Sequence, residues 1–310
     1  MRFFKKTNID FLKLRKVMYL SSSAVIFAGL VSLAIKGIDL GIDFRGGTEL
    51  VLSFAVKPEV SQVRAALGAV GLGQSEIKFF GGESDLLIRT TEQGEGTVVG
   101  DKIKQAISQA FPDKKFVVLK EDKIGPKIGE ELRRDALYAV TAAFLVILLY
   151  VAVRFKFIYG VGAVVALVHD VLVALGVLSL LNGVIPVLNL EITQEVVAAF
   201  LTLVGISVND TVVVFDRIRE NLKIYRSLSL AEVINKSLND TLSRTIITQG
   251  TVLLALTTLL FAGGEVTRGF AFTLTVGTIA GTYSSIYIAS AIVLDWTIRK
   301  KRKKELQAAV

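Results

Sequence analysis

IYGVGAVVALVHDVLVALGVLSLL, residues 158–181, is an apolar run interrupted by acidic or basic side chains only at His169 and Asp170. A helix needs about 20 mostly apolar residues to cross a bilayer. A buried helix of a soluble protein could explain one such run. Five more stretches of the same character follow or precede it, however: 17–35, 136–153, 194–215, 245–262 and 269–294. Together they predict a membrane bundle of six transmembrane helices.

The composition supports this class and excludes several others. The chain has 310 residues, 52% of them hydrophobic, and a mean hydropathy of +0.57, above that of a typical soluble domain. It has no Cys and one His, so disulfides, iron–sulfur clusters and thiol catalysis are excluded, and no metal site is expected. We expect no catalytic residue, and the sequence carries no Walker motif for ATP.

Basic residues occur in alternate connections between the apolar runs. They cluster in residues 1–16, at Arg154 and Lys156, between the fourth and fifth runs, and in the tail 295–310. The loop 182–193 has none. The positive-inside rule then places both termini in the cytoplasm and explains the net charge of +8 by contact with the lipid bilayer, without nucleic acid. The first run, 17–35, is longer than a signal peptide core and is interpreted as a retained anchor.

One large segment outside the membrane, residues 36–135, is predicted to face the periplasm. Alternating apolar residues predict strands at 48–56, 76–80, 85–90 and 115–120, and helical spacing predicts helices at 59–70 and 97–111. The β-α-β-β-α-β order is typical of a ferredoxin-like α+β domain. Residues 136–294 then hold the second to sixth transmembrane helices.

The fourth apolar run contains Asp210, about 9 Å inside the expected cytoplasmic boundary at 1.5 Å per residue. An ionisable group at that depth is costly and therefore a functional candidate. Helical spacing puts Asn209 in a polar arc beside it, and Leu201, Val204 and Val208 on the expected lipid face.

Arg244 begins the fifth run, on a stripe with three threonines: Thr248, Thr251 and Thr258. If the fourth and fifth helices pack antiparallel, Arg244 enters the membrane at the level of Asp210. Burial raises a carboxylate pKa and a nearby guanidinium lowers it, so such a pair can titrate in a useful range. The alternative is an ordinary boundary arginine beside a packing aspartate.

His169 and Asp170 form a second candidate, near the middle of the third run. An intramembrane His is often only a hydrogen-bonded helix contact, but an adjacent Asp makes membership in a proton relay a reasonable hypothesis. Small residues recur every four positions in the sixth run, which is typical of close helix packing; they are Thr273, Gly277, Gly281 and Ser285.

Four motifs resemble the SecF branch of the SecD/SecF family, within the resistance-nodulation-division superfamily. They are GIDFRGG (41–47), IGPKIG with ELRRD (124–135), VGISVNDTVVVFDRIREN (204–221) and FAGGEVTRGF (261–270). The 204–221 run is the most specific of them. Arg45 stands where the family commonly has Thr, and Ile206 where it commonly has an aromatic residue.

The resemblance implies a six-span half-transporter that pairs with the homologous SecD and associates with the SecYEG channel. It implies that the pair moves unfolded polypeptide outward with the proton gradient, with H⁺ as coupling ion and no other cofactor. The residues alone are also compatible with Na⁺, although an Asp paired with an Arg favours H⁺. Asp210 and Arg244 match the family's proton-linked pair, with Asn209 in the same motif. Asp43, Gly46 and Gly47 match its motif at the base of the external domain, a structural role.

Two other functions are compatible with six spans. One is a proton-driven efflux half-transporter for small molecules, although such pumps usually have twelve spans and much larger external domains. The other is a passive scaffold for the export channel, which would have no need of a carboxylate at the position of Asp210.

Overall fold

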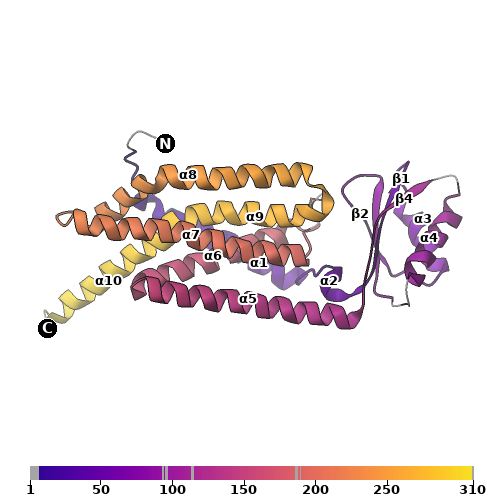
Figure 1. The fold of residues 1–310 in the computed structure, drawn as a ribbon, viewed down its shortest axis with the longest axis horizontal. Helices are drawn as coiled ribbons and strands as arrows, with labels where there is room; N and C mark the ends of the chain where they lie inside the picture. Colours follow the sequence, from indigo (N-terminus) through magenta and orange to yellow (C-terminus); the bar gives the residue numbers. More distant parts are fainter. Residues whose placement is uncertain are drawn as a thin grey trace.

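The computed structural model describes residues 7–92, 94, 97–112, 115–185, 188 and 190–308. The outer parts of the predicted termini, residues 1–6 and 309–310, lie outside this range. Long helices form one part of the molecule, and a small sheet with two short helices lies at one end of it (Figure 1). The long helices are α1 (Arg15–Lys36), α5 (Pro126–Arg154), α6 (Phe157–Leu181), α7 (Gln194–Ile224), α8 (Leu230–Ala262), α9 (Gly264–Ser284) and α10 (Ser290–Ala308), with a 3₁₀ turn η1 (Leu12–Leu14) and a π-helical turn η2 (Ser285–Ala289).

Six helical stretches of the described residues are long and apolar enough to cross a membrane. They are α1 with η1, α5, α6, α7, α8, and a continuous run of α9, η2 and α10. Helix α9 packs against α6, α7 and α8, whereas α5 leaves most of its surface exposed. The bundle therefore has a buried centre made by α6, α7 and α9.

Two helices begin well before their predicted apolar runs. Helix α5 begins at Pro126, a good first helical residue, ten positions before the apolar run. Helix α8 begins at Leu230, where Ser229 and Glu232 form a capping box. Both extensions contain charged residues, so an apolar window does not detect them. Their starts are marked instead by Pro126 at the first helical position of α5 and by the capping box of α8.

Close approach of α1 to α6 depends on two glycines. A Cβ atom on Gly29 would lie 2.4 Å from the Cα of Gly176, far inside van der Waals contact. Small residues let helix backbones meet in a membrane, where no hydrophobic effect drives helices together. This contact seats α1 in the bundle beside α6.

The part of the chain outside the helix bundle contains a four-stranded antiparallel sheet in the order β2-β3-β1-β4. Its strands are β1 (Gly47–Phe54), β2 (Glu76–Phe79), β3 (Asp85–Thr90) and β4 (Phe116–Ile124). Helices α3 (Val60–Ala69) and α4 (Val98–Ala110) contribute to one apolar core with strand residues such as Leu50, Leu52 and Ile88. Strand β4 runs on to Ile124 and almost directly into α5, which links the sheet to the bundle.

The motif at the start of the sheet has strict backbone requirements. Asp43 lies in the short helix α2 (Ile42–Arg45), and its carboxylate accepts a hydrogen bond of 2.9 Å from the Gln194 backbone N–H at the start of α7. Gly46 and Gly47 both have positive φ, +72° and +128°. A Cβ on Gly47 would lie 2.3 Å from the carbonyl oxygen of Thr90.

Replacing Gly47 with Ala should therefore destabilise the external sheet by about 2–5 kcal/mol, from backbone strain plus overpacking. Thermal unfolding of the purified protein measures this. Gly71→Ala is the matched control, because Gly71 also has positive φ (+83°) but nothing within 4 Å of its Cβ position. The control should cost only about 1–2 kcal/mol; equal effects would refute the clash.

A buried ion cluster connects the other face of the sheet to the loop before α7. Arg89 of β3 pairs with Glu49 of β1 and, at 2.8 Å, with Glu191 of that loop. Lys78 of β2 also contacts Glu191, which is 1% exposed. Burial would raise the pKa of Glu191, but Arg89 and Lys78 outweigh it and the net direction is downward.

The stability that this ion cluster contributes should decrease in acid. A carboxyl with a lowered folded pKa contributes stability above its unfolded pKa, about 4.3, and loses it as pH falls through the folded value. Glu191→Gln should cost about 3 kcal/mol near neutral pH and flatten this acid dependence, measured by unfolding between roughly pH 3 and 7. The control Glu83→Gln, whose ion pair with Lys57 is exposed, should change the stability little. If Glu191→Gln kept the acid dependence of the native chain, the ion cluster would not be its source.

Candidate functional site

Asp210 lies in α7 and is buried, 6% exposed, between three helices. Its Oδ1 accepts a hydrogen bond of 3.2 Å from the Thr245 hydroxyl of α8. Its Oδ2 accepts one of 2.6 Å from the Ser285 hydroxyl in η2. The buried amide of Gln249, one turn along α8 from Thr245, also interacts with this carboxylate. Asp210 is therefore held at the junction of α7, α8 and the last span.

Asp170 is a second carboxylate in the bundle and is fully buried. The His169 ring contacts it through Nδ1 at 2.8 Å. Ser207 of α7 donates a short hydrogen bond to Asp170 Oδ2, and Ser284 of α9 donates another, of 2.8 Å, to the same oxygen. Three side chains thus satisfy one buried carboxylate, as a low-dielectric interior requires.

The network continues from His169 to the first span. His169 Nε2 lies 3.0 Å from the Tyr283 hydroxyl, with the two rings edge to face. The same hydroxyl lies 3.2 Å from that of Ser22 in α1. A hydrogen-bonded path therefore runs from α1 through α9 and α6 to α7, ending at Ser207.

Two adjacent serines join the two carboxylates. Ser284 donates to Asp170 and Ser285 donates to Asp210, and both serines are fully buried. Ser285 begins the π-helical turn η2, and Ser290 closes a wide turn by donating to the Ser285 carbonyl at 2.8 Å. Single π-helical turns inside α-helices are frequent at functional sites. A shift of this turn would move the partners of both carboxylates together.

Arg244 and Asn209 lie on the outer surface of the chain, both exposed. No carboxylate of the described residues forms a salt bridge with Arg244. Thr245, the next residue, occupies the position against the carboxylate. The structure therefore brings Asp210 together with Thr245 and Ser285 and leaves Arg244 at the edge of this group.

The prediction of which face of α7 meets lipid is wrong. Val204 and Val208 are buried, 2% and 8% exposed, in the apolar core of the bundle. The polar arc with Asn209 is exposed instead, as is the stripe of Arg244, Thr248, Thr251 and Thr258 on α8. Helical spacing identifies faces but cannot say which one is covered, because the core and the lipid are both apolar.

The sequence did not predict that five polar side chains interact with the two buried carboxylates: Ser207, Thr245, Gln249, Ser284 and Ser285. A usable signal was present for two of them, since Ser207 lies one helical turn before Asp210 and Ser285 belongs to the small-residue stripe. That stripe also packs closely: a Cβ on Gly277 would lie 2.4 Å from the Leu203 side chain. Over the described part of the chain, no group of three or more His, Cys, Asp or Glu could hold a metal ion.

Comparison with known proteins gives consistent results along the whole chain. Residues 102–299 match the family model described as protein export membrane protein SecD/SecF, C-terminal, and residues 31–56 match the SecD/SecF GG motif. The protein translocase subunit SecF of Rhodothermus marinus is 46% identical over 100% of both chains. That of Desulfurispirillum indicum is 41% identical over 94% of this chain and 92% of the relative.

Two solved structures are also similar. The crystal structure of SecDF, a translocon-associated membrane protein from Thermus thermophilus, superposes with a TM-score of 0.82 at 37% identity. It covers 94% of this chain, but this chain spans only 39% of it. SecDF in its super-membrane-facing form gives a TM-score of 0.72 at 36% identity, covering 98% of this chain and 41% of that one.

Proposed function

The chain belongs to the SecD/SecF family of protein-export membrane proteins, and we propose that it is the SecF-type subunit that couples proton movement to polypeptide export. The chain is a multi-pass membrane protein of this family, which places it as an accessory subunit of Sec translocation in the bacterial inner membrane. The observation that carries the coupling proposal is Asp210, a carboxylate buried inside the bundle with hydroxyl partners on two neighbouring segments.

Asp210 and Arg244, with Asn209, form the proposed proton-coupling group. Protonation would neutralise Asp210 and weaken its attraction for Arg244. The Thr245 and Ser285 hydroxyls would then donate to a neutral carboxyl group instead of a charged carboxylate. Since moving one charge through 100 mV yields about 2.3 kcal/mol, one proton could bias a helix rearrangement by well over tenfold. His169 and Asp170 are proposed as a relay, joined to this group through Ser284 and Ser285.

A SecD-type partner is proposed to cover the exposed polar surface of α7 and α8. Asn209 and Arg244 are exposed in the isolated chain, and polar or charged side chains that face lipid are costly in a membrane-spanning helix. A homologous six-span subunit on this surface would remove that cost and enclose Asp210. The SecYEG channel and the unfolded exported polypeptide are the further proposed partners.

The proposed orientation has both termini in the cytoplasm and the sheet in the periplasm. Charge supports it, because the α5–α6 turn and the region around the α7–α8 connection are basic, whereas the loop 182–193 has no Lys or Arg. The order β2-β3-β1-β4 with α3 and α4 contributing to one core supports a ferredoxin-like domain.

Export into vesicles tests the function directly. Vesicles would contain the channel and the partner subunit, with or without this chain, and polypeptide import would be measured with and without a proton gradient. We expect the gradient to stimulate import only when this chain is present. Equal stimulation without it would overturn the proposal.

A further inference from the structure

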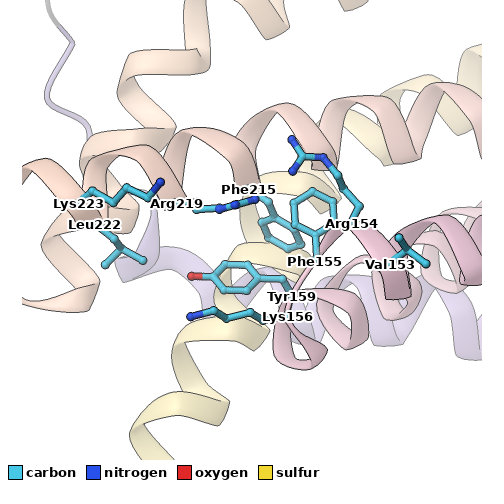
Figure 2. A pocket seen from close by; sticks show the side chains of 9 residues that line it. All are labelled: Val153, Arg154, Phe155, Lys156, Tyr159, Phe215, Arg219, Leu222 and Lys223. Carbon is cyan, nitrogen blue, oxygen red and sulfur yellow. The ribbon is translucent and has the colours of Figure 1, made fainter.

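A cavity of about 580 Å³ lies between the α5–α6 turn and the last turns of α7 (Figure 2). These segments are at the end of the bundle away from the sheet (Figure 1). We call this space the interfacial cavity; its lining residues are Val153, Arg154, Phe155, Lys156, Tyr159, Phe215, Arg219, Leu222 and Lys223. The turn between α5 and α6 forms one wall and the last turns of α7 form the other. This volume is within the range of ordinary ligand sites.

The inner part of the interfacial cavity is aromatic. Phe215 is fully buried and meets Phe155 and Tyr159 edge to face, at 5.8 and 5.1 Å between ring centroids. Val153, at the rim, is 81% exposed on the outer surface of α5. Since α5 is a membrane-spanning helix, this side of the cavity opens towards lipid chains.

The outer part is basic. Phe215, Arg219 and Lys223 lie at i, i+4 and i+8 on one face of α7, so the face changes from aromatic to cationic as the helix leaves the membrane. In Figure 2, the Lys156 amino group extends to the same side as the Tyr159 hydroxyl, and the Lys223 amino group points towards them from the opposite direction. None of the lining residues is acidic.

Only one of these four cations is neutralised nearby. Arg154 donates from Nη2 to both carboxylate oxygens of Asp216, at 2.9 and 2.8 Å. In the described ranges of the chain, no carboxylate lies within salt-bridge distance of Lys156, Arg219 or Lys223. Three uncompensated cations therefore surround a cavity whose inner wall is apolar.

We propose that the interfacial cavity binds an anionic phospholipid, with its phosphate on Lys156, Arg219 and Lys223 and an acyl chain leaving past Val153. A basic pocket between helices at a membrane boundary suits a lipid phosphate, and aromatic side chains suit the same depth. The apolar wall and the opening towards lipid favour a lipid over free phosphate. Lipid binding in this cavity is independent of the proposed export role. The proposed orientation places the cavity at the cytoplasmic leaflet, and only this placement rests on that proposal.

Native mass spectrometry of the full chain tests this, with phosphatidylglycerol and phosphatidylcholine of identical acyl chains. Each cation near anionic lipid contributes roughly a fivefold effect, so K156Q/R219Q/K223Q should lose affinity for phosphatidylglycerol on the order of a hundredfold. The charge-matched control K16Q/K301Q/R302Q, on exposed residues outside the cavity, should bind as the native chain does. K156R/K223R should also retain binding, and size-exclusion profiles should show all variants folded.

Each contrary result overturns the proposal in a distinct way. Equal binding of the two lipids, or equal loss in the control, would remove any specific site. Displacement of the lipid by inorganic phosphate at equal concentration would assign the cavity to a soluble anion. If the native chain and the other variants formed a dimer and only K156Q/R219Q/K223Q were monomeric, the interfacial cavity would instead bind a second copy of the chain. None of these outcomes depends on export activity, so the lipid site and the export function fail separately.

Discussion

Asp210→Asn is expected to abolish the stimulation of export by a proton gradient while leaving gradient-independent export unchanged. The amide is nearly isosteric with the carboxyl, and its oxygen can still accept a hydrogen bond from Ser285 or Thr245. The variant should therefore fold and assemble but carry no proton. At 100 mV one proton supplies about 2.3 kcal/mol, so the loss should reach on the order of fiftyfold if one proton drives each step.

The matched control for this experiment lies on the same helix. Asp216→Asn removes a carboxylate six residues further along α7, where it is half exposed and paired with Arg154. Exposed pairs contribute little, so this variant should respond to the gradient as the native chain does. Import into vesicles is the measurement for both. Normal stimulation of the Asp210→Asn variant, or an equal defect in Asp216→Asn, would remove Asp210 from the coupling step.

The membrane-spanning helices were predictable because hydropathy acts locally. A run such as 158–181 must be buried in lipid or protein whatever its neighbours do, and α6 occupies Phe157–Leu181. The starts of α5 and α8 were not predictable from hydropathy, because the segments before the apolar runs carry charged residues. These helices begin at local signals, Pro126 at the first helical position of α5 and Ser229 at the N-cap of α8. Strand positions in the sheet followed from alternation, within two residues except at the end of β4.

The partners of the buried carboxylates required the tertiary structure. Asp210 was identifiable as a costly residue in an apolar run, yet its ligand Ser285 lies 75 residues away. Which face of α7 is buried could not be decided from spacing, so Val204 and Val208 were assigned to lipid although they pack in the core. His169 and Asp170 are adjacent in sequence, but their link to Ser284 depends on how α9 crosses α6.

Asp170→Asn is the second replacement with a large expected effect. Asp170 accepts hydrogen bonds from Ser207 and Ser284 on one oxygen, and Asn offers one acceptor oxygen and a donor amide. Part of the network from Ser22 to Ser207 must then reverse or break. If the network couples to Asp210, gradient-dependent export should fall between about fivefold and 150-fold, the usual range of coupling between sites. The same vesicle assay measures it.

The serine pair distinguishes coupling from simple packing. Ser284→Ala removes a donor to Asp170 and Ser285→Ala removes one to Asp210, so each should lower gradient-dependent export. Thr273→Ala is the control: Thr273 is also fully buried on α9, but its hydroxyl donates to the Gly269 carbonyl of its own helix and touches neither carboxylate. A purely structural role predicts that all three variants lower thermal stability alike and leave the ratio of export with and without a gradient unchanged. A lowered ratio in the two serine variants alone would mean that η2 transmits protonation between the two carboxylates, because its first residue, Ser285, donates to Asp210 and the residue before it, Ser284, donates to Asp170.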